Sequence, residues 1–177
     1  LPRSTHGGRD GVALIGPLLS RGRALLLGAS VDGRASIMLR SIMPKSGTRL
    51  HTALNSYLLE GTIGEGGSGI VWNATDDDGE ARAIKILRPN EDRSIKGKRF
   101  RNEIKFGRKD NHPSIVRIID DGSFDKESAP RSFYVMPRYK MSLRVAMEGT
   151  ADSQERLRWL NMILDGVEAA HLVGVVH

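Results

Sequence analysis

Three glycines and a lysine at fixed spacing constrain the fold of this chain more than any other feature. Gly64, Gly66 and Gly69 form the pattern G-x-G-x-x-G, and Val71 extends it to G-x-G-x-x-G-x-V. Glycines at this spacing let the backbone come close to phosphate oxygens, because no Cβ is in the way. Lys85 follows fourteen residues after Val71, between apolar neighbours. The combination predicts a phosphate-binding loop and a nearby cation.

The residues around the glycines predict a loop between two strands. Residues 70–75 read Ile-Val-Trp-Asn-Ala-Thr and favour a strand. Asp78-Gly79 is typical of a hairpin turn, and residues 81–87 read as the next strand. A dinucleotide-binding loop would instead open a helix, and the sequence contains no G-x-x-x-x-G-K-[ST] pattern. The remaining interpretation is a hairpin that covers phosphates, followed by a strand that carries Lys85.

These residues resemble the protein kinase family over about residues 57–177. The resemblance implies an α+β fold, with a kinase N-lobe over residues 55–137 that contains a five-stranded antiparallel sheet and one helix. The hinge and the first long helix of the C-lobe would follow over residues 138–177. We expect the N-lobe helix over residues 96–109, the fourth strand over 115–119, a turn at 120–122 and the fifth strand over 133–136.

The resemblance also implies roles for individual residues. Lys85 would contact the α- and β-phosphates of ATP, and Glu103 would hold Lys85 in an ion pair, which makes these two the candidate catalytic residues. Val71 and Ala83 would cover the adenine, and Met136 would occupy the gatekeeper position before the hinge. The full expected ATP-binding set is Gly64, Glu65, Gly66, Gly67, Ser68, Gly69, Val71, Ala83, Lys85, Met136, Arg138 and Tyr139.

The last residues resemble the entrance of the catalytic loop. A helix is expected over residues 153–173, and His177 matches the histidine that opens H-R-D-L-x-x-x-N. In the family, the catalytic Asp and the two Mg²⁺ ligands follow this histidine. We therefore expect a fragment that lacks the base and the metal ligands and has no turnover. The earlier run Asp76-Asp77-Asp78 is interpreted as a solvated turn.

The parent protein is expected to transfer the γ-phosphate of ATP to protein hydroxyls, with Mg²⁺ as the metal. The glycine loop resembles those of bacterial or plant-type serine/threonine kinases, and this general likeness favours that specificity. Two alternatives stay open. One is a pseudokinase that binds nucleotide or a partner without chemistry, and the other is a small-molecule kinase of related fold.

The positive charge is concentrated near the start of the chain. The net charge is +6; residues 1–50 contain 8 Lys/Arg and 2 Asp/Glu, whereas residues 51–177 contain 19 of each. We interpret residues 1–50 as a basic leader that is disordered, similar to a transit peptide, or non-native upstream of Met43. Because no excess charge remains downstream, we expect no basic face on the folded part and no nucleic-acid partner.

Two further classes are excluded by composition. The most apolar stretch, residues 12–27, is interrupted by Pro17, Arg21 and Arg23, so we expect no membrane span. The absence of cysteine excludes disulfides and thiolate metal sites. Both features are consistent with the expected cytoplasmic location.

Overall fold

The computed structural model describes residues 12–13, 43–66, 68–89, 91–109, 112–126, 129–149 and 151–175. Most of the expected leader, Gly67 of the glycine loop and His177 therefore lie outside the described residues. The chain divides into two compact units. One comprises residues 17–111 and 117–138, and the other residues 1–16, 112–116 and 139–177.

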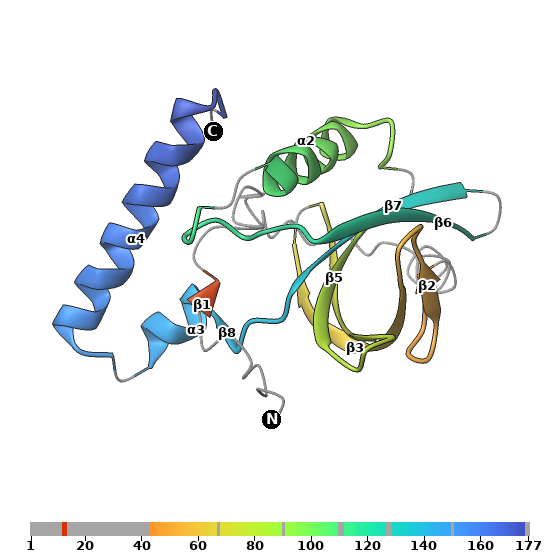
Figure 1. Cartoon of the computed structure of the whole chain (residues 1–177), viewed down its shortest axis with the longest axis horizontal. Helices are drawn as coiled ribbons and strands as arrows, with labels where there is room; N and C mark the ends of the chain where they lie inside the picture. Colours follow the sequence, from red (N-terminus) through yellow and green to blue (C-terminus); the bar gives the residue numbers. More distant parts are fainter. Residues whose placement is uncertain are drawn as a thin grey trace, which may run out of the picture. The chain divides into compact units, whose positions relative to one another are not determined.

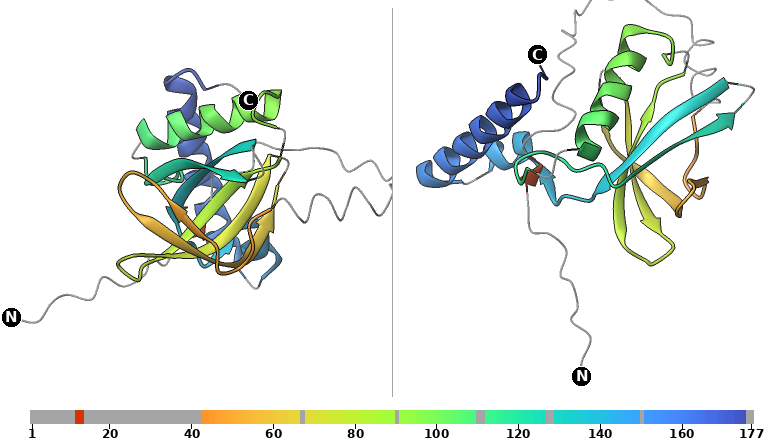
Figure 2. Two further views of the ribbon diagram at one scale, coloured as in Figure 1. Left: turned by 90° about the vertical axis from the view of Figure 1, so that its right-hand side faces the viewer. Right: turned by 45° about the horizontal axis from the view of Figure 1, so that its top comes forward.

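The first unit is a six-stranded antiparallel sheet with one helix (Figures 1 and 2). The strand order is β2-β3-β4-β5-β7-β6. The strands are β2 (Arg49–His51), β3 (Ser56–Glu65), β4 (Gly69–Asp76), β5 (Ala81–Leu87), β6 (Asp120–Lys126) and β7 (Ala129–Pro137). Helix α2 (Ile95–Lys109) lies along the sheet, as the views of Figure 2 show. The kinase-like α+β arrangement is confirmed, and β2 is an additional strand at one edge.

The core of this unit lies on one face of the sheet and extends upstream of the kinase-like region. Trp72, Ile84 and Val135 contribute to it from the central strands. Met43 and Leu50, which are 8% and 2% exposed, belong to the same cluster. The amide of Gly47 donates to the carbonyl of Leu59. The folded unit therefore includes residues 43–50, which the sequence had placed in the leader.

The expectation of a fourth strand over residues 115–119 with a turn at 120–122 is wrong. Strand β6 begins at Asp120, and residues 116–119 precede it without regular structure. The carboxylate of Asp120 is buried and accepts hydrogen bonds from Thr52 Oγ1 at 2.6 Å and Tyr57 Oη at 2.8 Å. A Cβ on Gly122 would lie 2.8 Å from the Phe133 ring. Asp120 and Gly122 therefore make close contacts within the sheet and do not form a turn.

Residues 76–78, the three aspartates at the end of β4, were expected to lie in solvent, but one of them is buried. Asp76 is 7% exposed, and its carboxylate accepts from the amides of Asp78 and Glu80 and pairs with Arg82 at 2.8 Å. Gly79 has φ +80°, which suits the left-handed position of this hairpin turn. Asp76 therefore organises the turn, while Asp77 and Asp78 are exposed.

Helix α2 is anchored at both ends. At its start, Ser94 Oγ accepts from the amides of Lys96 and Gly97. A Cβ on Gly97 would lie 2.3 Å and 2.4 Å from two backbone carbonyl oxygens of the preceding loop, so glycine permits this close approach. Near its end, the carbonyl of Gly107 accepts from the amide of Ile118 at 2.9 Å. Arg108 also pairs with Asp121 on β6.

The second unit contains short parallel strands and two helices. β1 (Val12–Ala13) pairs with β8 (Met141–Ser142), and α3 (Leu143–Glu148) and α4 (Ser153–Leu172) follow. Asp152 caps α4 by accepting from the amide of Glu155 at 2.7 Å. Gly174 has φ +81° just after the helix, as expected for a helix stop.

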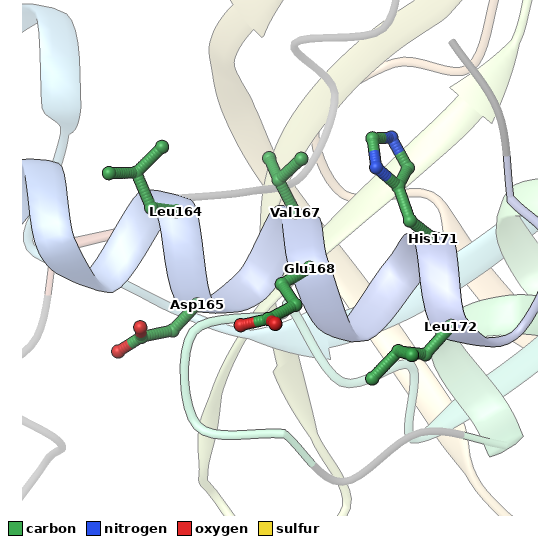
Figure 3. Close-up of a pocket in the computed structure, with 6 residues that line it drawn as sticks. All are labelled: Leu164, Asp165, Val167, Glu168, His171 and Leu172. Carbon is green, nitrogen blue, oxygen red and sulfur yellow. The ribbon is translucent and has the colours of Figure 1, made fainter.

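The surface of α4 carries exposed apolar side chains, among them Leu157, Leu160 and Leu164. Figure 3 shows the residues that line a pocket along this helix: Leu164, Val167 and His171 lie on one side, and Asp165, Glu168 and Leu172 lie on the other. Within the described part of the chain, no helix combines the length and apolar character needed to cross a membrane.

Replacing Asp120 with alanine should destabilise the sheet unit by about 3 kcal/mol, because Thr52 and the buried Tyr57 lose their common acceptor. Urea unfolding of the chain would measure this. Asp125→Ala, at an exposed position on the same strand, should stay within about 0.5 kcal/mol. Equal effects of the two substitutions would contradict the role of Asp120.

Candidate functional site

A buried ion pair joins the sheet to α2. Lys85 Nζ on β5 lies 2.7 Å from Glu103 Oε2 on α2. The side chain of Lys85 is 1% exposed and that of Glu103 is 13% exposed. Glu103 is the only acidic residue of α2, and Lys85 is the only lysine of β5. The structure therefore brings the two predicted catalytic residues into direct contact.

Two aromatic side chains surround this ion pair. Lys85 Nζ lies 5.5 Å from the ring centroid of Phe100 and 5.6 Å from that of Tyr134, within the range of a cation–π interaction. Tyr134 Oη also donates to Glu103 Oε2 at 3.1 Å. Burial raises the pKa of Tyr134 well above its usual value, and the charge of Glu103 raises this pKa further. The hydroxyl therefore remains a donor at neutral pH.

The sheet register places the expected nucleotide-contacting residues on one face. Val71 on β4 and Tyr134 on β7 are both cross-strand partners of Lys85, and Met136 on β7 is the partner of Ala83. Cross-strand partners point to the same side of a sheet, and residues two apart on a strand do too. This site face is opposite the core face that carries Trp72, Ile84, Ile86, Phe133 and Val135.

The glycine loop connects β3 and β4, with Gly64 paired to Val71 and Gly69 paired to Leu87. The amide of Gly66 donates to the carbonyl of Gly69 at 2.9 Å. A Cβ on Gly69 would lie 2.4 Å from the carbonyl oxygen of Ile86. A Cβ on Gly64 would meet only the Val71 Cβ, at 4.0 Å. Gly69 is thus needed for strand packing, whereas Gly64 leaves open space.

Arg88, which the sequence reasoning missed, ties the loop to the end of β5. Its guanidinium pairs with Glu65 and reaches the carbonyl of Gly66, and its amide donates to the carbonyl of Ser68 at 3.3 Å. Ser68 is 4% exposed, and within the described ranges its hydroxyl has no hydrogen-bond partner. A charged residue just after an apolar strand that carries a lysine could have signalled this contact.

The two predicted hinge residues fall on either side of the division between the units. Arg138 belongs to the sheet unit, and its Nε donates to Asn73 Oδ1 on β4. Tyr139 belongs to the other unit and is half-buried. Arg138 is therefore held by a side-chain contact that the sequence did not suggest.

The residues present fit a polyphosphate ligand. The buried ammonium group of Lys85 lies on the same sheet face as its cross-strand partner Val71, and Val71 is paired on its other side with Gly64 of the glycine loop. A lysine ammonium group can neutralise phosphate oxygens. The part of the chain that the structure describes contains no cluster of three or more His, Cys, Asp or Glu side chains able to hold a metal ion. The described residues therefore fit the phosphates of a nucleotide, and they offer no cluster of ligands for a metal ion.

Replacing Gly69 with alanine should destabilise the sheet unit by about 2 kcal/mol, because the new Cβ would overlap the carbonyl of Ile86. The matched substitution Gly64→Ala should change stability by less than about 0.5 kcal/mol, since its Cβ would meet open space. Thermal or urea unfolding distinguishes the two. A destabilisation at Gly64 as large as that at Gly69 would refute the assignment.

Comparison with known proteins agrees with this geometry. The family model described as "Protein kinase domain" matches residues 57–177. Three similar proteins are PknB of Corynebacterium glutamicum, described as a probable serine/threonine-protein kinase, pknA2 of Bifidobacterium longum, described likewise, and the serine/threonine-protein kinase PknK of Mycobacterium tuberculosis.

The identities are 32% over 127 residues for PknB, 32% over 130 for pknA2 and 33% over 119 for PknK. These alignments cover 68%, 68% and 65% of this chain but only 20%, 16% and 10% of the relatives. The chain thus spans a fifth or less of the length of these relatives. Together with the buried lysine–glutamate pair and the glycine loop, the match shows that this chain belongs to the protein kinase family.

Proposed function

We propose that this chain provides the ATP-binding part of a protein kinase that phosphorylates serine or threonine hydroxyls of proteins. The observation that carries the proposal is the buried Lys85–Glu103 pair, on the sheet face that also bears Val71, Ala83 and Met136. The serine/threonine preference is supported by the names of the similar proteins. Because ATP is the co-substrate, we also propose a cytoplasmic location for this unit.

In the proposed reaction, a hydroxyl oxygen of the substrate attacks the γ-phosphorus, the bond from this phosphorus to the bridging oxygen breaks, and ADP leaves. Lys85 would contact α- and β-phosphate oxygens, and Glu103 with Tyr134 would hold its ammonium group in place. Mg²⁺, when bound, would neutralise charge on the phosphates. Its ligands and the catalytic base are not assigned to residues 1–177.

The remaining residues of the site face would bind the rest of the nucleotide. The backbone of the glycine loop, residues 64–69, would cover the phosphates. Val71, Ala83 and Met136 would form an apolar surface against the adenine. Backbone groups of Arg138 and Tyr139 would hydrogen-bond the adenine edge. Pro137 could only accept a hydrogen bond there, because proline has no backbone N–H.

Lys85→Met should weaken ATP binding by about tenfold or more, because a neutral thioether cannot contact phosphate oxygens. Isothermal titration of the 177-residue chain with ATP measures the affinity. Lys45→Met, at an exposed position in the same unit, should bind as the parent chain does. If Lys85→Met bound ATP with unchanged affinity while remaining folded, the proposed role of Lys85 would be wrong.

We further propose that residues 1–177 alone bind ATP without turnover, since no H-R-D or D-F-G sequence occurs among them. An assay with radiolabelled ATP and a general protein substrate should give no transfer above the blank. Transfer above the blank would overturn this part of the proposal. A pseudokinase, which would transfer no phosphate, and a small-molecule kinase, which would transfer it to a small molecule and not to protein, remain the alternatives.

A further inference from the structure

The outer face of α2 carries a concentration of positive charge that the even overall charge of residues 51–177 had hidden. The helix contains seven basic residues and one acidic residue, Glu103, which turns inward to Lys85. The expectation of no basic face on the folded part is therefore wrong. Acidic and basic residues that cancel each other in the net charge of residues 51–177 lie apart in the folded unit.

Three of these seven basic residues have acidic partners. Lys96 pairs with Glu91, Arg101 lies 3.9 Å from Asp92, and Arg108 pairs with Asp121. The other four are exposed and have no ion pair with any described residue. These four are Lys98, Arg99, Lys105 and Lys109. Arg99 is four residues before Glu103 and lies on the same side of the helix, so we call the three lysines the α2 basic face.

The three lysines of the α2 basic face form a continuous stripe. Lys98, Lys105 and Lys109 are spaced seven and four residues apart, which places them on one side of a helix over a length of about 16 Å. Lys105 lies four residues from both Arg101 and Lys109, and like charges at this spacing destabilise a helix. The helix also contains two glycines and has no acidic residue in its first turn. Its own sequence therefore leaves the repulsion uncompensated.

We infer that the α2 basic face is a docking surface for an acidic protein segment, which binds along the stripe and stabilises α2. The argument is charge complementarity: carboxylates beside Lys98, Lys105 and Lys109 would replace repulsion with attraction. The inference goes beyond nucleotide binding, because these side chains lie on the outside of the helix and Glu103 lies on the inside.

The size and composition of the face favour a protein segment over other polyanions. Proteins that bind duplex DNA typically contact about six to ten phosphates, which exceeds the four uncompensated cations available here. Anchoring in a membrane surface uses apolar side chains beside the cations. Between the lysines the stripe contains only Asn102, and Ile95, which is 73% exposed and three residues before Lys98, is a single apolar side chain at its start.

The first test is binding of an oligoglutamate peptide to the 177-residue chain, followed by fluorescence anisotropy at low salt. Lys105→Glu should weaken binding by about fivefold or more, and about 0.5 M salt should weaken it strongly. The matched control Arg117→Glu, at an exposed position outside α2, should bind nearly as the parent chain does. Oligoglutamine of the same length should not bind.

The second test is hydrogen exchange of the α2 amides, which reports on the helix itself. Bound oligoglutamate should slow their exchange, and Lys105→Glu without peptide should slow it by about threefold, because the reversed charge attracts Lys109. The proposal thus requires one substitution, Lys105→Glu, to stabilise the free helix and to weaken its docking. Absence of peptide binding, equal loss with Arg117→Glu, unchanged α2 exchange, or tighter binding to duplex DNA or anionic vesicles would each overturn it.

Discussion

The position of α2 against the sheet depends on the buried charge of Lys85. An ammonium group that is 1% exposed loses nearly all its hydration, and the effective cost in proteins is several kcal/mol. Glu103 at 2.7 Å offsets that cost, and the faces of Phe100 and Tyr134 add to the offset. Because Lys85 is on a strand and Glu103 is on the helix, the charge is balanced only when α2 lies where the structure has it.

The two faces of the central strands carry different sets of residues: one set forms the hydrophobic core, and the other forms the candidate site. Even-numbered positions on β4 and β5, such as Trp72 and Ile84, face the apolar core. Their odd-numbered neighbours Val71, Ala83 and Lys85 face the opposite side, with Tyr134 and Met136 supplied by β7. A shift of one residue in the β4–β5 register would exchange the two sets. The hydrophobic core therefore also sets the orientation of the site.

The sequence predicted what depends on short-range patterns. The glycine spacing, the alternation around Lys85 and the lone acidic residue at Glu103 identified the family and the central pair. The sequence-based prediction failed where contacts between side chains distant in the sequence determine the local structure. Asp120 resembles a turn residue until Thr52 and Tyr57 donate to it, and Arg88 matters only because the loop folds back onto it. The positive charge on α2 was missed because the net charge of residues 51–177 does not show where the charged side chains lie in the folded unit.

The short strand β2 has a consequence for where this domain begins. The match to the kinase family starts at residue 57, yet Arg49, Leu50 and His51 pair with β3, and Leu50 is buried in the core. Without them, residues 56–58 of β3 would lose their strand partners, and unpaired amides and carbonyls at a sheet edge invite pairing with other chains. The start of the family match and the start of the folded sheet unit thus differ, and β2 leaves a three-residue strand, in place of the start of β3, at this edge of the sheet.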